Sequence, residues 1–176
     1  VKAEGRARLA QSGDCSAANS HKKEFDKSSN ALHKACGGWR LLCGGGEPTG
    51  QGRVADFKRI GPEKRLKALA AEKVYTSNDG VGGYLPLHML CANPPVSVDA
   101  VKFVGNLYPA AAAIPTSKSR GVKLTTHAFE DALPLHLLCL DKSVTAELFG
   151  AVAALYPAAL DAGCTEYAGG GQVKAL

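Results

Sequence analysis

A seven-residue stretch that occurs twice limits the folds open to this chain more than any other feature. Leu-Pro-Leu-His-Met-Leu-Cys at 85–91 returns 48 residues later as Leu-Pro-Leu-His-Leu-Leu-Cys at 133–139. The two copies then stay in register, without a gap, up to Tyr-Pro-Ala-Ala at 108–111 and 156–159. A fixed period of this order is typical of repeat proteins, in which each copy forms one supersecondary unit.

Prolines mark where each unit begins and ends. Pro86 and Pro134 stand where a proline can begin a helix, because the first helical residue needs no amide donor. The apolar residues that follow predict a short buried helix. Pro109 and Pro157 are predicted to close the units, because the residue before a proline is disfavoured in a helix.

A second helix is predicted inside each unit. Ser97 and Thr145 are good N-caps, and Asp99 and Glu147 place a negative charge in the first turn, where the helix dipole favours it. Apolar residues then recur at helical spacing in both copies, at Val101, Val104, Leu107 and Tyr108 and at Phe149, Val152, Leu155 and Tyr156. Each copy therefore predicts a helix, a turn and a second helix.

The unit resembles an ankyrin repeat, whose first helix typically opens with Thr-Pro-Leu-His. Here Leu stands in place of Thr, Tyr-Pro-Ala-Ala replaces the usual Gly-rich hairpin start, and the period exceeds the standard one by about 15 residues. This form is similar to a divergent ankyrin variant of unicellular algae. The resemblance implies that each motif histidine hydrogen-bonds to a neighbour's backbone, and that the structural motif comprises Pro86, Leu87, His88, Cys91, Tyr108, Pro109, Pro134, Leu135, His136, Cys139, Tyr156 and Pro157.

A degenerate copy precedes the two clear ones. Asn30–Cys36 has His and Cys at the same spacing, an apolar Leu before the His, and Asn30 in the cap position. A helix over Pro62–Tyr75 is predicted to complete this unit across the Gly-rich insertion at 44–50. We therefore expect an all-α fold, a short ankyrin-like array of helix-turn-helix repeats with irregular Gly-rich arms. Its expected segments are an extended basic arm (1–29), a degenerate first repeat with a Gly-rich insertion (30–80), a repeat (81–111), an insertion loop (112–132), a second repeat (133–160) and a flexible tail (161–176).

The net charge of +5 is unevenly distributed along the chain. Residues 1–78 hold 15 Lys/Arg against 8 Asp/Glu, whereas residues 79–176 hold 6 against 8. This asymmetry fits docking to an acidic surface or to a nucleic acid, and a solvated face is the other interpretation. Within the insertion loop we predict that Lys118, Arg120 and Lys123 bind a partner, because connecting segments commonly carry recognition.

His and Cys recur three residues apart at 33/36, 88/91 and 136/139. On a helix the two side chains share a face, which allows a metal site. A structural zinc ion needs four converging ligands, however, and pairs one repeat apart would each lack two. We predict a structural role with no metal, no cofactor and no catalytic residue. A His/Cys metal-binding domain and a cysteine nucleophile are the alternatives.

The six cysteines do not suggest a disulfide framework. Cys91 and Cys139 fall at equivalent positions in apolar helices, where cysteine behaves as a small buried hydrophobic residue. The spacing of the others, Cys15, Cys36, Cys43 and Cys164, does not show whether they pair. We expect an intracellular, reducing compartment.

These features predict a non-catalytic module for protein–protein interaction, such as a scaffold, linker or accessory subunit of a larger assembly. A short helical array exposes an extended face for this purpose. The algal resemblance implies a plastid host such as a photosystem–antenna complex. No run reaches the roughly 20 apolar residues that span a bilayer, so membrane association is expected only through partners. A basic nucleic-acid- or ribosome-associated protein is the main alternative.

Overall fold

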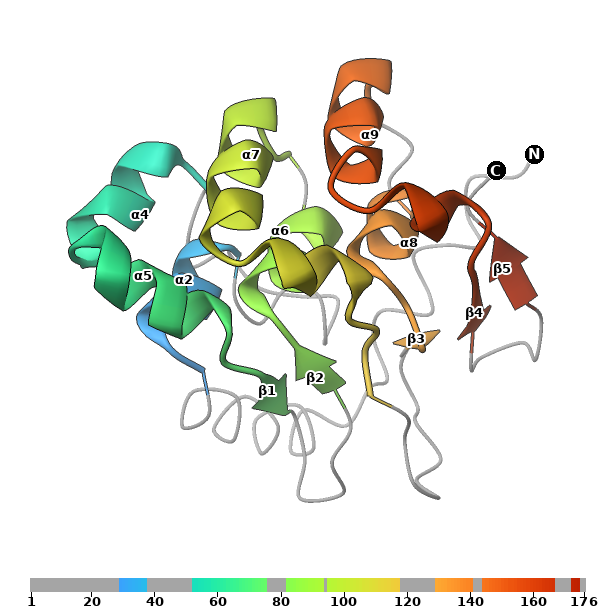
Figure 1. The fold of residues 1–176 in the computed structure, drawn as a ribbon, viewed down its shortest axis with the longest axis horizontal. Coiled ribbons are helices and arrows are strands. Elements are labelled where there is room, and N and C mark those ends of the chain that lie inside the picture. The colour runs from blue at the N-terminus through green and yellow to red at the C-terminus, as the bar shows by residue number, and fades with distance from the viewer. Residues whose placement is uncertain are drawn as a thin grey trace, which may run out of the picture.

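A computed structural model of the chain describes residues 29–37, 52–75, 82–93, 95–117, 129–140, 144–166 and 172–174. These residues are mostly helical, as the sequence predicts (Figure 1). The α-helices are α2 (Ala31–Ala35), α4 (Val54–Ile60), α5 (Glu63–Ala70), α6 (Pro86–Ala92), α7 (Val98–Leu107), α8 (Pro134–Leu138) and α9 (Ala146–Ala153). The 3₁₀-helices are η1 (Pro109–Ala113) and η2 (Pro157–Leu160). The strands are β1 (Val74–Tyr75), β2 (Gly82–Tyr84), β3 (Phe129–Glu130), β4 (Gly163–Glu166) and β5 (Gln172–Lys174).

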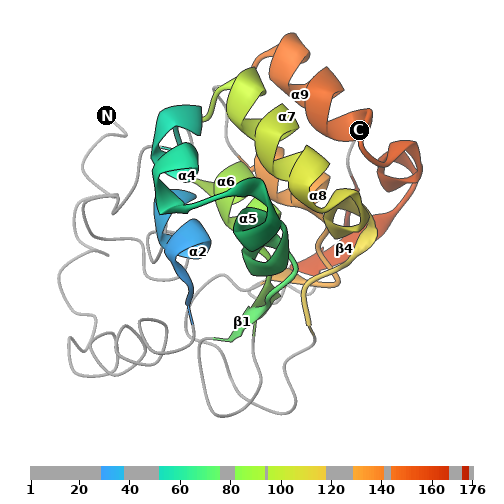
Figure 2. The same ribbon diagram turned by 60° about the vertical axis from the view of Figure 1, so that its left-hand side comes forward.

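The helices pack in two rows. The first row contains α2, α6 and α8, and the second row contains α5, α7 and α9. Across the rows α2 packs against α5, α6 against α7, and α8 against α9. Helix α4 packs against α2, α5 and α7, and Figure 2 shows α7 lying between α5 and α9. Within the described segments, no helix is both long enough and apolar enough to cross a membrane.

Hydroxyl side chains cap α7 and α9, as predicted. Ser97 Oγ accepts a hydrogen bond from the Ala100 amide (3.2 Å), and Thr145 Oγ1 accepts one from the Leu148 amide (3.2 Å). The acidic residue expected in each first turn is also in place. These bonds satisfy amide groups that have no partner inside the helix. The sequence therefore identifies correctly where both second-row helices begin.

The prolines at the ends of the units have a second role that the sequence did not indicate. Helix α7 ends at Leu107 and α9 at Ala153, ahead of Pro109 and Pro157. Each proline then begins a 3₁₀-helix, η1 or η2, at a position where proline is well tolerated. Both 3₁₀-helices bury alanines against the core, so packing continues past the two prolines into η1 and η2.

In the segment before the first clear copy, one predicted helix is shorter than expected and a second helix was missed. The helix predicted over 62–75 ends at Ala70, and strand β1 follows it and pairs with β2. Helix α4 was not predicted at all, although Val54, Phe57 and Ile60 lie three residues apart, which is a helical spacing. Phe57 is fully buried. The segment expected over 30–80 therefore contains an additional helix, which packs against α2, α5 and α7.

The C-terminal segment predicted as a flexible tail (161–176) contributes two strands. Strand β4 pairs antiparallel with β3 on one side and with β5 on the other. The all-α prediction thus omitted two small antiparallel sheets, β1–β2 and β3–β4–β5. Strands this short depend on backbone pairing more than on a pattern of apolar side chains, so the sequence carries little signal for them.

One hydrophobic cluster runs through the helices of both rows. Its largest fully buried apolar side chains are Phe57, Leu32, Leu85, Leu87, Met89, Leu90, Leu135, Leu137 and Leu138. Cys36 and Cys91 are buried free thiols, whereas Cys139 is exposed, so its predicted burial was wrong. The reason is position, because no further first-row helix follows α8 in the described part of the chain. Cys15, Cys43 and the Cys164 side chain lie outside the described residues.

The contact between α7 and α9 gives a stability test with an internal control. A Cβ atom on the buried Gly105 would lie 2.7 Å and 3.0 Å from the two methyl groups of Leu155, whereas one on the exposed Gly150 would meet nothing within 4 Å. Overpacking costs about 1–3 kcal/mol, and replacing a helical glycine recovers up to about 1 kcal/mol. We expect Gly105→Leu to lower the free energy of unfolding by about 1–2 kcal/mol in urea titrations, and Gly150→Leu to leave it unchanged or raise it. Equal effects would contradict the packing of α7 on α9.

Candidate protein-binding surface

The motif prolines and leucines hold the first-row helices in the core. Pro86 and Pro134 occupy the first helical positions, as predicted. Leu87 and Leu135 are each 1% exposed. The motif tyrosines, Tyr108 and Tyr156, are half-buried and directly precede η1 and η2. These residues are part of the packed interior and present no reactive group at the surface.

The motif histidine completes the start of its own helix. The Leu85 amide donates to His88 Nδ1 (3.1 Å), and the Leu133 amide donates to His136 Nδ1 (3.1 Å). A leucine side chain in the cap position cannot accept a hydrogen bond from the helix amides. The imidazole nitrogen instead accepts one from the backbone amide of the capping leucine. In α2 the cap is conventional, because Asn30 Oδ1 accepts from the amides of the second and third helical residues.

The second ring nitrogen binds a later part of the chain. A nitrogen that accepts from an amide carries no proton, so neutral His88 and His136 carry theirs on Nε2. His136 Nε2 donates to the Ala162 carbonyl (3.0 Å), directly before β4. His33 Nε2 donates to the Tyr84 carbonyl (3.1 Å), directly before α6. These bonds tie α2 and α8 to the backbone of a later segment, as the ankyrin resemblance implied.

His88 lies deepest in the core. It is fully buried, and its Nε2 has no hydrogen-bond partner among the described residues. Burial lowers the pKa of His88 from 6.5 to about 3. The nearby carbonyls of Ile114 and Ala132 raise this pKa, although neither forms a hydrogen bond with the ring. The positive charge of Lys73, and that of His33 when it is protonated, lower the pKa. The ring is therefore neutral at any physiological pH.

His33 is neutral for the same reason. Burial lowers the pKa of His33 to about 4, although the hydrogen bond to the Tyr84 carbonyl and the charge of Glu72 both raise it. Its Nδ1 has no partner among the described residues. The Tyr84 ring stands edge-on to His88, with ring centroids 6.3 Å apart, so the two histidines flank one buried tyrosine.

The thiols of the His-x-x-Cys pairs are held in their protonated form. Burial raises the pKa of Cys91 to about 12 and raises the pKa of Cys36 and Cys139 above the ordinary value. A protonated thiol is a poor nucleophile and a poor metal ligand. Among the described residues, no group of three or more His, Cys, Asp or Glu side chains is placed to hold a metal ion. This part of the chain therefore offers neither a ligand set nor an activated thiol.

The residues predicted to bind a partner, Lys118, Arg120 and Lys123, lie outside the described residues. The structure does show how the two ends of their segment are joined. The Thr116 amide donates to the Ala132 carbonyl (3.0 Å), and the Ala132 amide donates to Thr116 Oγ1 (3.0 Å). Both residues are buried. The insertion predicted over 112–132 therefore leaves and re-enters the core at one point.

A pocket that the sequence did not indicate lies between α4, α5 and α7. Its volume is about 370 Å³, and its lining consists of Leu66, Phe103 and Leu107 together with Lys58, Gly61, Glu63 and Asn106. Phe103 stacks on Phe57, with ring centroids 5.8 Å apart and an interplanar angle of 17°. The pocket was missed because α4 was missed. The helical spacing of the apolar residues around Phe57 was the available signal.

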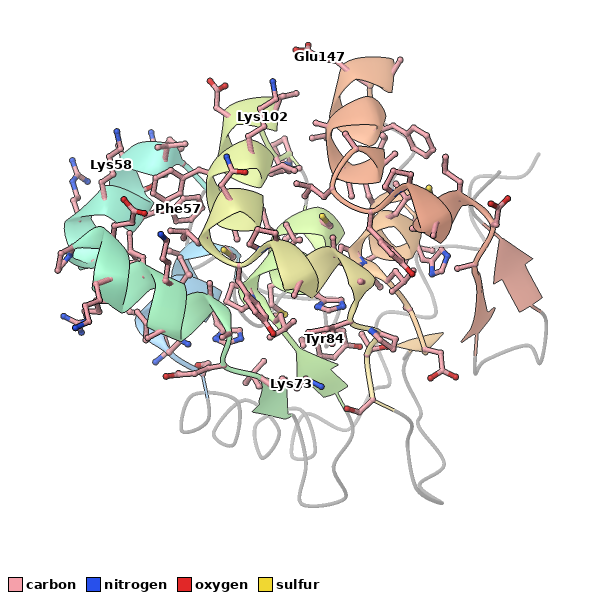
Figure 3. All side chains as sticks on the ribbon, viewed as in Figure 1. Phe57, Lys58, Lys73, Tyr84, Lys102 and Glu147 are labelled. Carbon is pink, nitrogen blue, oxygen red and sulfur yellow. The ribbon has the colours of Figure 1, made fainter. Side chains whose placement is uncertain are left out.

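The segment that carries α4 and α5 is rich in basic residues, of which Lys58 lines the pocket. Residues 52–75 contain seven Lys/Arg and three Asp/Glu. Asp56 pairs with Arg53 (3.5 Å) and Arg59 (3.3 Å), and Glu63 pairs with Lys67 (2.7 Å). Figure 3 shows Lys58 projecting outward from α4. Four cations of this segment form no ion pair with any described residue, namely Lys58, Lys64, Arg65 and Lys73.

Comparison of the chain with protein-family models, curated proteins and solved structures finds no match. The interpretation of this surface therefore depends on the residues described above. They form an apolar pocket within a segment rich in Lys and Arg, at one end of two rows of helices in which His33 and His136 bind backbone carbonyls.

Proposed function

We propose that this chain is an ankyrin-like repeat protein that binds other proteins, as a scaffold, linker or accessory subunit of a larger assembly. The observation that carries the proposal is the order of the three His-x-x-Cys helices in one row, each packed against a second-row helix. In this proposal α2/α5 is the degenerate repeat, and α6/α7 and α8/α9 are the two clear copies. Repeats that contact only their neighbours leave an extended surface for partners.

The chemistry of the motif supports binding over catalysis. The histidines of α2 and α8 each bind a backbone carbonyl, and burial keeps the rings of His33 and His88 neutral. The thiol pKa values are raised, which opposes nucleophilic chemistry. In keeping with the resemblance to algal repeats, we propose a plastid assembly such as a photosystem–antenna complex as the first host to examine.

Nucleic-acid binding is the second candidate function. The excess of Lys/Arg in residues 52–75 favours it. Neutralising several phosphates would make binding fall steeply with salt concentration. A protein complex stabilised by apolar contacts would depend on salt mainly through its association rate. Salt dependence of the equilibrium constant therefore separates the two candidates.

The test starts from the full chain and its native source. The immobilised chain captures partners from membrane and soluble fractions, and the partner identified by mass is purified and titrated against the chain. We expect a stoichiometric complex whose equilibrium constant changes little with salt. Binding to RNA alone, with a steep salt dependence, would overturn the proposal.

The insertion gives a second test of how the partner is bound. Replacing Lys118, Arg120 and Lys123 with Ser should slow association and flatten its salt dependence, because exposed charges steer docking. Replacing Lys64, Arg65 and Lys73 with Ser is the charge-matched control. Both variants should unfold like the parent chain in urea. If association is indifferent to the first change, and also to deletion of residues 118–128, the insertion is a spacer.

A further inference from the structure

The pocket between α4, α5 and α7 has the properties of a receptor for a single anchoring side chain. We infer that it accepts a large apolar side chain presented by an acidic segment of a partner protein. This inference rests on the proposed function and specifies the partner's chemistry at one site. The pocket lies on the second-row side of the molecule, beside the additional helix α4, so it belongs to the part of the chain that departs from the repeat pattern.

The pocket wall is apolar and already formed. Leu66 and Leu107 are 2% and 7% exposed, so the core holds them in place. Phe103 is half-buried, and its stacking on the buried Phe57 fixes its orientation. A volume of about 370 Å³ is at the lower end of the range for ligand pockets, and it has room for an aromatic or long aliphatic side chain together with part of its flanking residues. Anchors of this kind supply most of the affinity at protein interfaces.

The rim is basic in net effect. Lys58 has no ion pair among the described residues, whereas the charge of Glu63 is offset by Lys67 at 2.7 Å. The hydrogen bond and charge of Lys67 also lower the pKa of Glu63. Asn106 is exposed and adds a neutral donor and acceptor. An acidic segment is the complement of such a rim, because charges around an apolar anchor set specificity and association rate.

No segment outside the described residues is strongly acidic, since the shorter segments 76–81, 141–143 and 167–171 together hold only two Asp and one Lys. Residues 1–28 contain six Lys/Arg and four Asp/Glu, and residues 118–128 contain three Lys/Arg and no Asp/Glu. Residues 38–51 contain one of each kind. None of these segments supplies the acidic surroundings that the rim would favour. The complementary segment therefore belongs to another molecule.

Protein fits this pocket better than nucleic acid does. A phosphate backbone binds along a track of cations, whereas the lining of this pocket combines an apolar wall with one cation, Lys58, and one carboxylate, Glu63. Bases stack on open aromatic faces. Phe103 has one face occupied by Phe57, which reduces the area available to a base.

The test uses the full chain and a synthetic probe. The probe is a fluorescein-labelled peptide of alternating Glu and Asp with one central Phe. Two control peptides replace the Phe with Ala, or the acidic residues with Ser. In fluorescence anisotropy at low salt, we expect the probe to bind at least about tenfold more tightly than either control, as removal of an anchor typically costs. Equal affinity for all three peptides would overturn the inference.

Paired variants locate the binding. Asn106→Trp fills the pocket mouth, and Ala154→Trp places the same side chain at the exposed position 48 residues later, beyond the end of α9. Lys58→Glu reverses a rim charge, and Lys64→Glu makes the same change in net charge away from the pocket lining. We expect Asn106→Trp to weaken the probe about tenfold and Ala154→Trp to leave it unchanged, with Lys58→Glu more harmful than Lys64→Glu.

The outcomes separate this inference from the proposed function. If Asn106→Trp leaves probe binding intact, the pocket is not the receptor. If the probe fails to bind while the native protein partner still forms its complex, this inference is wrong and the proposed function stands. If Asn106→Trp abolishes binding of RNA, or prevents dimerisation of the chain, the pocket has a different occupant. Either result would overturn the inference of an acidic protein partner. All four variants are first checked for unchanged urea unfolding.

Discussion

Acidification from about pH 7.5 to about pH 4.5 is expected to lower the free energy of unfolding by about 5 kcal/mol. His33 and His88 have pKa values of about 4 and about 3 in the folded chain, against 6.5 when unfolded. Below pH 6.5 the unfolded chain therefore binds protons that the folded chain does not, which favours unfolding. This contribution to stability is present in full above pH 6.5. It is lost as the pH falls toward the pKa values of the two histidines in the folded chain. The loss reaches about 2.5 kcal/mol per histidine by pH 4.5.

A loss of this size is comparable to the whole stability of many domains, which is about 5–15 kcal/mol. Urea titrations followed by circular dichroism between pH 7.5 and 4.5 measure it, in a range where most carboxylates stay ionised. The control is the double variant His33→Gln/His88→Gln. It should be less stable than the parent at pH 7.5 but should lose much less stability on acidification. A free energy of unfolding that is flat over this range in the parent would mean that both rings are solvated.

His136→Ala is expected to lower the free energy of unfolding by about 1–3 kcal/mol. The ring is 3% exposed, and its removal leaves the Leu133 amide and the Ala162 carbonyl without their partners. An unpaired buried polar group costs more than the net value of the bond it made. The substitution also releases the link between α8 and the backbone that leads into β4.

Cys139→Ala is the matched control for this variant. Cys139 follows α8 directly and is exposed, so truncating it should change stability by no more than about 0.5 kcal/mol. Urea unfolding of both variants at pH 7.5 makes the comparison. If His136→Ala were as mild as Cys139→Ala, the histidine would not be the structural element described here.

The sequence was sufficient for features that local chemistry determines. Proline at the first helical position, Ser97 and Thr145 as caps, and the His-x-x-Cys recurrence each act within a few residues. Asn30 as the cap of α2 belongs to the same class. These features predicted both helices of each clear copy and the short helix of the degenerate one. That the histidines bind backbone was implied by the ankyrin resemblance.

Features that depend on long-range contacts were not accessible in the same way. Helix α4 is short and highly charged. Its buried residue Phe57 stacks on Phe103, which lies far along the chain, so the sequence around α4 does not show this contact. The pocket depends on this contact, because Phe103 is part of its lining. Cys139 occupies the position equivalent to Cys91 in the sequence repeat. It is exposed because no further first-row helix follows α8 among the described residues. The strands of the C-terminal segment likewise depend on pairing with a distant partner.

His33, His88 and His136 are structural groups bonded to backbone, and burial keeps the rings of His33 and His88 neutral. The most direct measurement is long-range ¹H–¹⁵N NMR correlation of the imidazole rings during a pH titration of the ¹⁵N-labelled chain. We expect His33, His88 and His136 to carry their proton on Nε2, and the rings of His33 and His88 to remain neutral down to about pH 5. Mixed tautomers that titrate near pH 6.5, or ring signals that shift when zinc is added at neutral pH, would contradict this expectation.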